Sequence, residues 1–167
     1  SGEVEVSVDS GWQAVEVGDF VLENQSMRVG EGSFCELQFG ERAVVRIEEN
    51  TKIDLNTLFL KPDESDIKLN VEVGTVLCKV NKLSEGEQFK VKTKTAVCGV
   101  RGTEFGVTVD KKNKTALAVR EGKVAILPSS VDVDSLKKQA AESDVSITEI
   151  IEELETTAPV VTANQEV

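Results

Sequence analysis

The chain contains no histidine and no tyrosine, and each absence excludes a class of site. Histidine is the commonest general base and metal ligand, so Ser-His-Asp triads, Cys-His pairs and His-based zinc centres cannot be assembled from these 167 residues. A single tryptophan leaves few aromatic rings on which a sugar could stack. We therefore expect no catalytic residues, no metal site and no cofactor. A polysaccharide-active enzyme working with carboxylates alone is the least favoured function.

Cysteine is also scarce, and its spacing excludes a disulfide scaffold. Cys35, Cys78 and Cys98 form no C-x-x-C pair, and an odd number cannot all pair within one chain. We expect all three thiols to occupy or border inward strand faces, where free cysteine behaves as a small hydrophobe. The alternative is one disulfide with one thiol left over.

The chain also has no excess of basic residues. It contains 19 Lys and Arg but 30 Asp and Glu, for a net charge of −11. This sign opposes general binding to nucleic acid or to an anionic membrane. The charge is unevenly distributed, since residues 75–128 carry 11 basic and 5 acidic residues while both flanking regions are acidic. No apolar run approaches the roughly 20 residues that a membrane span requires. We expect neither a nucleic-acid partner nor a membrane span in these residues.

Alternation of apolar and polar residues dominates up to about residue 127 and is typical of strands with one buried face. Glycine-containing turns separate the strands, and no convincing helical period occurs before residue 130. The sequence therefore predicts a mainly β domain over residues 1–128, an irregular β-solenoid or a twisted two-sheet β-sandwich of about ten short strands. A strand that ends in a glycine turn recurs at Val15–Gly18, Val71–Gly74 and Val119–Gly122, which slightly favours winding, although any β protein can reuse such a strand exit. The alternating residues include Val4, Val6 and Val8; Val15 and Val17; Cys35, Leu37 and Phe39; Val44–Arg46; Ile53 and Leu55; Ile67–Val73; Val76, Cys78 and Val80; Phe89 and Val91; Phe105, Val107 and Val109; Leu117 and Val119; and Val124 and Ile126.

The pattern changes after Pro128, and residues 129–167 are expected to form an acidic helical appendage with a flexible C-terminal tail. Ser146 and Glu149 have the spacing of a capping box. The candidate partner-binding residues Ile147, Ile150, Ile151 and Leu154 follow at one face of the predicted helix. So short an amphipathic helix needs an apolar groove, either on its own β body or on another protein. The opposite charge of residues 75–128 favours a cap on its own body.

One segment departs from the alternating pattern, since two glycines and an Arg and a Glu three residues apart interrupt an apolar strand at Thr95–Phe105. Its V-R-G-T-E-F core, Val100–Phe105, resembles the hallmark of the FecR domain family. Thr93 is followed by Lys94, where that family often has Thr-Pro. The resemblance covers roughly residues 2–127 and is carried also by Trp12–Asp19, Glu36–Phe39, Val45–Ile47, Glu49–Thr51, Val73–Val76 and Glu121–Val124.

This resemblance implies an all-β module in the periplasm or elsewhere in the extracytoplasmic cell envelope, with a protein partner. Some members of the family carry signals from outer-membrane transporters to a sigma factor, which implies a non-enzymatic interaction or sensing module, with iron-uptake signalling as one form. The alternative is a carbohydrate- or cell-wall-binding scaffold module.

The hallmark residues Arg101, Gly102, Thr103, Glu104 and Phe105 are the candidate site, with two interpretations. Arg101 and Glu104 could recognise a peptide or sugar, or could form a buried pair that fixes a strand corner. The flanking apolar residues favour the second interpretation.

Overall fold

The computed structural model describes residues 3–61, 64–84, 86–130, 160–162 and 165–166, and over these residues the chain forms strands and no helix. The mainly β prediction is confirmed. The structure has more strands than the ten expected. The strands are β1 Val4–Val8, β2 Gly11–Ala14, β3 Ser26–Val29, β4 Cys35–Phe39, β5 Ala43–Ile47, β6 Thr51–Lys61, β7 Glu64–Val80, β8 Gln88–Lys92, β9 Ala96–Val100, β10 Thr103–Val109, β11 Thr115–Glu121, β12 Lys123–Pro128, β13 Val160–Thr162 and β14 Gln165–Glu166. Two of them, β6 and β7, are long, at 11 and 17 residues.

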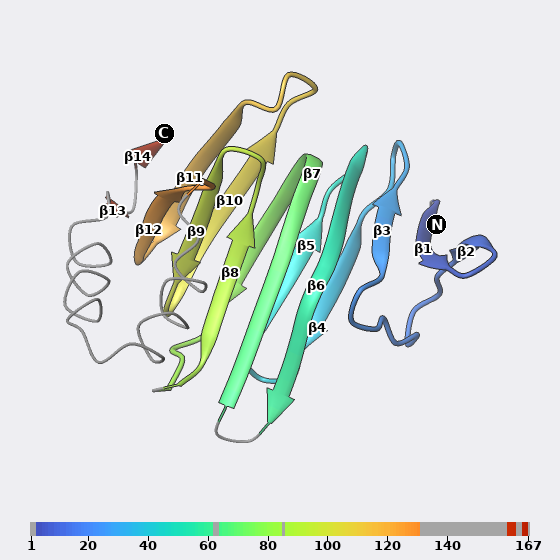
Figure 1. Ribbon diagram of the computed structural model, residues 1–167, viewed down its shortest axis with the longest axis horizontal. Helices are drawn as coiled ribbons and strands as arrows, with labels where there is room; N and C mark the ends of the chain where they lie inside the picture. The colour runs from blue at the N-terminus through green and yellow to red at the C-terminus, as the bar shows by residue number, and fades with distance from the viewer. Residues whose placement is uncertain (1–2, 62–63, 85, 131–159, 163–164, 167) are drawn as a thin grey trace.

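The strands build one open sheet that is folded into two layers by β7 (Figure 1). The first half of β7 pairs with β6 and β8 in a layer that also holds β1, β2, β3, β9, β12 and β13, here named sheet A. The second half pairs with β5 and β10 in a layer that also holds β4, β11 and β14, here named sheet B. The two sheets therefore share their central strand.

The core lies between the inner faces of the two sheets. Alternate residues of β7 are buried on either side of Gly74, with Ile67, Leu69 and Val71 in sheet A and Val76 and Cys78 in sheet B. The sheets meet directly at Phe39 of β4 and Phe89 of β8, whose rings pack edge to face with centroids 6.4 Å apart. Of the two architectures expected from the sequence, the layered one describes this arrangement.

Gly74 marks the point at which β7 passes from sheet A to sheet B. Its φ is +100°, a backbone conformation that residues other than glycine rarely adopt. A Cβ at this position would lie 2.5 Å from the Cα of Thr51. The hydroxyl oxygen of Thr51 accepts a hydrogen bond from the Thr75 N–H at 2.9 Å, which holds β6 against the corner. The alternating pattern on either side of Gly74 thus belongs to one bent strand.

Two predictions about the ends of the chain differ from the structure or fall outside it. Val15 and Val17 alternate like strand residues, yet they lie in the connection between β2 and β3, and Val17 is fully exposed. The predicted tail contains short strands, because β13 pairs with β12 and β14 pairs with β11. The predicted helix with Ile147, Ile150, Ile151 and Leu154 lies outside the described residues. In the part of the chain that is described, no helix is long and apolar enough to cross a bilayer.

Candidate functional site

A hollow of about 820 Å³ lies on the outer face of sheet B and is here named the sheet B groove. Side chains alternate along each strand, so the outward residues of β5, β7, β10 and β11 share this face. The strand register places Leu77 opposite Gly106, and Gly106 opposite Ala118. Its outward lining consists of Glu36, Val44, Arg46, Leu77, Lys79, Glu104, Gly106, Ala118 and Arg120.

The floor of the groove is apolar at Leu77, which lies between Gly106 of β10 and Arg46 of β5. Leu77 is 44% exposed and Val44 is 38% exposed, although both lie in the middle of a sheet face. A Cβ at Gly106 would lie 3.0 Å from a terminal methyl carbon of Leu77, so the glycine gives that side chain its room. Exposed apolar residues grouped in a hollow are typical of an interaction surface.

Charged side chains border this floor in two groups. Glu104 lies 3.0 Å from the Lys79 Nζ and 3.4 Å from a guanidinium nitrogen of Arg120. The hydrogen bond from Lys79, reinforced by the charges of Lys79 and Arg120, holds the pKa of the Glu104 carboxyl below its ordinary value. The side chain of Arg120 is 86% exposed, so most of its hydrogen-bonding capacity is open to solvent or to a ligand.

On the opposite border, Arg46 connects the charged rim to an exposed aromatic ring. Its Nε donates to the carboxylate of Glu48 at 2.8 Å, and one of its terminal nitrogens lies 3.6 Å from Glu36. The guanidinium carbon lies 3.9 Å from the centre of the Phe34 ring, which itself is 55% exposed. Stacking on the ring fixes the orientation of the guanidinium plane.

The structure separates the hallmark residues by the alternation of β10. Thr103 and Phe105 point into the core, and the Thr103 hydroxyl donates to the Lys123 carbonyl at 3.0 Å. Gly102, with φ at +67°, forms the turn between β9 and β10. Glu104 faces the sheet B groove.

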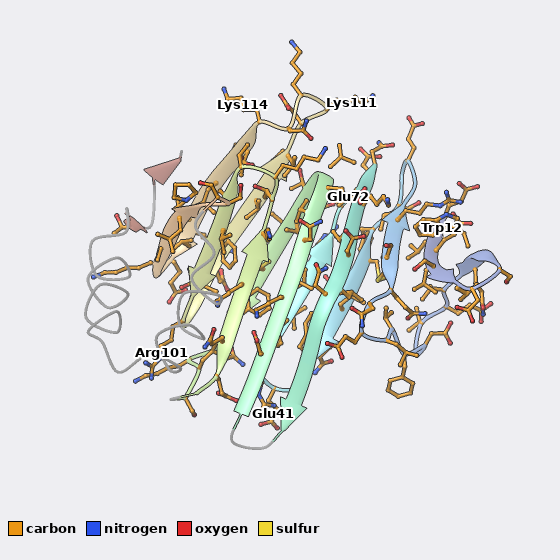
Figure 2. The ribbon with its side chains drawn as sticks, viewed as in Figure 1. Trp12, Glu41, Glu72, Arg101, Lys111 and Lys114 are labelled. Atoms are coloured by element: carbon orange, nitrogen blue, oxygen red, sulfur yellow. The ribbon has the colours of Figure 1, made fainter. Side chains whose placement is uncertain are left out.

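Arg101 does not pair with Glu104. Its side chain is exposed at the end of the β body that lies opposite the Lys111–Lys114 turn (Figure 2), and its Nε donates to the Leu83 carbonyl at 2.8 Å. Glu104 bonds to Lys79 and Arg120 instead. The interpretation of Arg101 and Glu104 as a buried pair is therefore wrong, because Arg101 lies in the turn after β9 and Glu104 is the second residue of β10, with its side chain outward.

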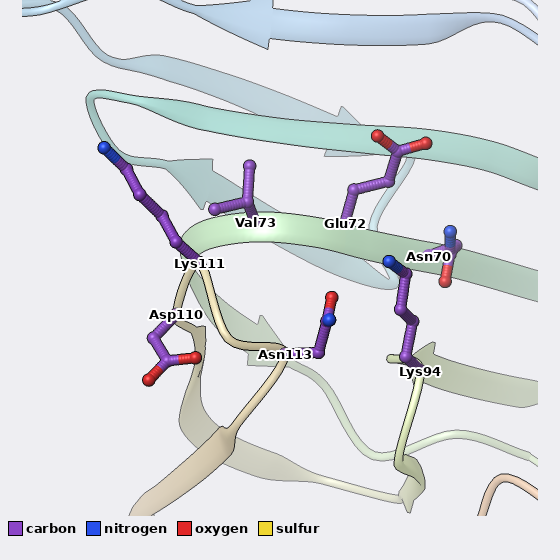
Figure 3. Close-up of a pocket in the computed structure, with 7 residues that line it drawn as sticks. All are labelled: Asn70, Glu72, Val73, Lys94, Asp110, Lys111 and Asn113. Atoms are coloured by element: carbon purple, nitrogen blue, oxygen red, sulfur yellow. The ribbon is translucent and has the colours of Figure 1, made fainter.

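A smaller hollow of about 440 Å³ lies where the β10–β11 turn approaches the middle of β7 (Figure 3). Lys94 and Lys111 line it together with Glu72 and Asp110. One oxygen of the Asp110 carboxylate accepts the N–H groups of both Lys112 and Lys114, each at 2.8 Å. The two lysines and two carboxylates balance in charge, and Asp110 bonds to the backbone of its own turn. Both features stabilise the turn and do not indicate a ligand site.

The three thiols are free, and two of them are buried, as the sequence predicts. Burial raises the pKa of the Cys78 thiol and raises that of Cys98 to about 11, while Cys35 is partly buried and its pKa is also raised. Among the described residues no group of three or more Cys, Asp or Glu side chains is arranged to hold a metal ion.

Sequence reasoning missed the apolar floor of the sheet B groove. The signal was present, because Ala43-Val44-Val45 and Val76-Leu77-Cys78 are runs of three apolar residues within an otherwise alternating pattern. Such a run places one apolar side chain on the outer face of the sheet. Which outward residues become neighbours depends on strand order, which alternation does not reveal.

Comparisons with known proteins agree with this architecture. Two crystal structures of a putative anti-sigma factor from Parabacteroides distasonis resemble the chain with a TM-score of 0.58 and 20% sequence identity, over 84% of this chain and 52% of theirs. The chain thus spans about half the length of those structures, and at this identity the likeness shows the fold. No curated protein matches the sequence. The FecR protein family matches residues 25–125, which include β3 to β11, the start of β12 and the hallmark segment but not Trp12–Asp19. The chain belongs to the FecR family.

Proposed function

We propose that this chain is a non-enzymatic, extracytoplasmic sensing module that binds a protein partner through the sheet B groove. Membership of the FecR family and a fold shared with an anti-sigma factor support a signalling or regulatory role. The observation that carries the proposal is the exposure of Leu77 and Val44 in the middle of a charged sheet face. Apolar area exposed beside Arg and Lys side chains suits a protein surface with matching apolar and acidic groups.

Signalling of the iron-uptake type is the form of this function that the family resemblance suggests. In that case the partner is an outer-membrane transporter. The proposed location in the periplasm or elsewhere in the cell envelope follows from the same resemblance, and a fusion to a reporter active only outside the cytoplasm tests it.

A carbohydrate- or wall-binding role has less support from the groove. Among its described lining residues the only aromatic side chain is Phe105, which is 3% exposed. A sugar ring would therefore find no aromatic platform on the floor. Retention of the protein on peptidoglycan, unaffected by substitutions in the groove, would favour this alternative.

Site-specific photo-crosslinking in cells tests the proposal. A photoreactive phenylalanine analogue placed at Val44, on the groove, should yield a discrete crosslinked protein that mass spectrometry can identify. The same analogue at Gln88, an exposed position of sheet A, is the matched control and should not yield that product. Leu77→Glu should abolish the crosslink from Val44. Equal crosslinking from both positions, or a crosslink that survives Leu77→Glu, would contradict the groove as the binding surface.

A further inference from the structure

The connection between β2 and β3, residues 15–25, exposes more apolar surface than any other described turn and is here named the N-terminal loop. Val17 and Phe20 are almost completely exposed, at 108% and 92%, and Leu22 is 64% exposed. Trp12, at the adjoining β2, marks this end of the molecule in Figure 2. The N-terminal loop lies outside the residues that match the FecR family, apart from its last residue.

Hydrogen bonds hold the N-terminal loop in place. Asn24 donates its backbone N–H to the Leu55 carbonyl at 2.6 Å, and the Leu55 N–H donates to the Gln25 carbonyl at 2.9 Å. The Gln25 side chain donates to the Ser7 carbonyl at 3.0 Å and accepts the N–H of Leu22 at 2.7 Å. The loop is thus bound to β1 and β6 of sheet A. It cannot reach the sheet B groove of its own chain, but it can present Phe20 to a second molecule without a large ordering cost.

All the charged side chains of the N-terminal loop are acidic. Glu16, Asp19 and Glu23 surround the exposed apolar residues, and no Lys or Arg precedes Arg28. The Asp19 carboxylate also accepts the Glu16 N–H at 2.9 Å, which shapes the turn before Phe20. A surface that receives this loop must offer an apolar floor with cations at its border.

The sheet B groove offers these features. Its apolar floor contains Val44 and Leu77, and its volume of about 820 Å³ exceeds that of one phenylalanine side chain. Its three cations, Arg46, Lys79 and Arg120, outnumber the two lining carboxylates, Glu36 and Glu104, with which they are paired. Lys79 and Arg120 have side chains that are 67% and 86% exposed, so they can reach toward an acidic ligand.

We infer that the N-terminal loop of one copy docks into the sheet B groove of a second copy, with Phe20 over Leu77 and the loop carboxylates beside Lys79 and Arg120. The inference rests on the proposed role of the groove as a binding surface. The contact is heterologous, because each copy contributes its loop to one neighbour and its groove to another. A bound second copy would therefore compete with the protein partner for the groove.

Sedimentation of two complementary variants tests the inference. Phe20→Glu removes the loop contact and leaves the groove intact, whereas Leu77→Glu does the reverse. The weight-average mass of the wild type should rise with concentration above the 18.1 kDa of a single chain, whereas each variant alone should stay at that mass. An equimolar mixture of the two should form a dimer that does not grow further, since only one loop and one groove remain competent. Gln88→Glu, which changes charge on the outer face of sheet A, should associate like the wild type.

Other outcomes overturn the inference. A wild type that remains monomeric at every concentration contradicts it, and so does association of either variant to the wild-type extent, or a monomeric mixture of the two. Equal melting temperatures establish that the variants are folded, and Val44→Glu replaces Leu77→Glu if that protein does not fold. The proposed function is judged separately, because Phe20→Glu should keep the photo-crosslink from Val44 to a different protein while losing self-association.

Discussion

At the scale of single residues, Arg42 and Glu87 form a well-enclosed charged pair, unlike the Arg and Glu of the hallmark. The Arg42 Nε donates to the Glu87 carboxylate at 2.6 Å, and these side chains are only 20% and 8% exposed. Glu87 also accepts the Ser84 N–H at 2.8 Å and faces the Ser65 hydroxyl at 3.3 Å. The backbone hydrogen bond from Ser84 and the guanidinium of Arg42 hold the pKa of the Glu87 carboxyl below its ordinary value.

Replacing either member of this pair should destabilise the protein more than replacing Glu104. Arg42→Ala or Glu87→Gln removes an ion pair from a largely enclosed site, and we expect the melting temperature to fall by about 5 °C or more. Glu104→Gln disrupts contacts to the exposed Lys79 and Arg120, and we expect a fall of less than about 2 °C. Thermal unfolding followed by circular dichroism checks both values. Equal effects at Glu87 and Glu104 would contradict this ranking.

Burial of the thiols predicts that the protein loses stability at alkaline pH. The pKa of Cys98 rises from 9.0 to about 11 on burial, so the folded state retains a proton that the unfolded state releases. The resulting stabilisation is complete below pH 9 and is lost as the pH rises toward 11. Two pKa units correspond to about 3 kcal/mol in the free energy of unfolding. Urea unfolding at a series of pH values should show a shallower decline for Cys98→Val than for the wild type, and parallel declines would contradict the assignment.

At the scale of elements, Gly74 bends β7. Alternation alone would divide this one strand into two. Gly74→Ala should lower the free energy of unfolding by about 3 kcal/mol or more, because the new Cβ adds backbone strain to a clash with Thr51. Gly99→Ala is the matched control, since a Cβ there meets nothing within 4 Å and φ is not positive. Denaturant unfolding of both variants provides the measurement. A Gly74→Ala protein as stable as Gly99→Ala would show that the corner accepts a side chain.

Alternation predicted strands well where one face is buried, and failed where other forces determine the conformation. Cys35, Leu37 and Phe39 alternate with polar residues and form β4. Val15 and Val17 show the same period, but Gly18, at φ +100°, and the hydrogen bonds of Asp19 bend this segment into a turn. The strands β13 and β14 carry no strong pattern, and they form by pairing with the edges of β12 and β11.

At the scale of the whole molecule, the sequence left a solenoid and a sandwich open because strand order is a long-range property. Val80 pairs with Ala43 on one side and with Thr103 on the other, and no local signal specifies either neighbour. The sheet B groove depends on these pairings, since they bring Leu77, Gly106 and Ala118 together. The hallmark segment could therefore identify the family while its role at the groove remained unpredictable.

Because β7 belongs to both sheets, it determines how the two layers unfold. Both halves of this strand are flanked by neighbours, β6 and β8 in sheet A and β5 and β10 in sheet B. Neither layer can lose its central strand while the other keeps it, so we expect one cooperative unfolding unit. The amides from Ile67 to Val80 should exchange slowest with deuterium, all with one opening free energy equal to that of global unfolding. Native-state hydrogen exchange by NMR measures these values, and a lower opening free energy for Thr75–Val80 than for Ile67–Val73 would show that the layers open separately.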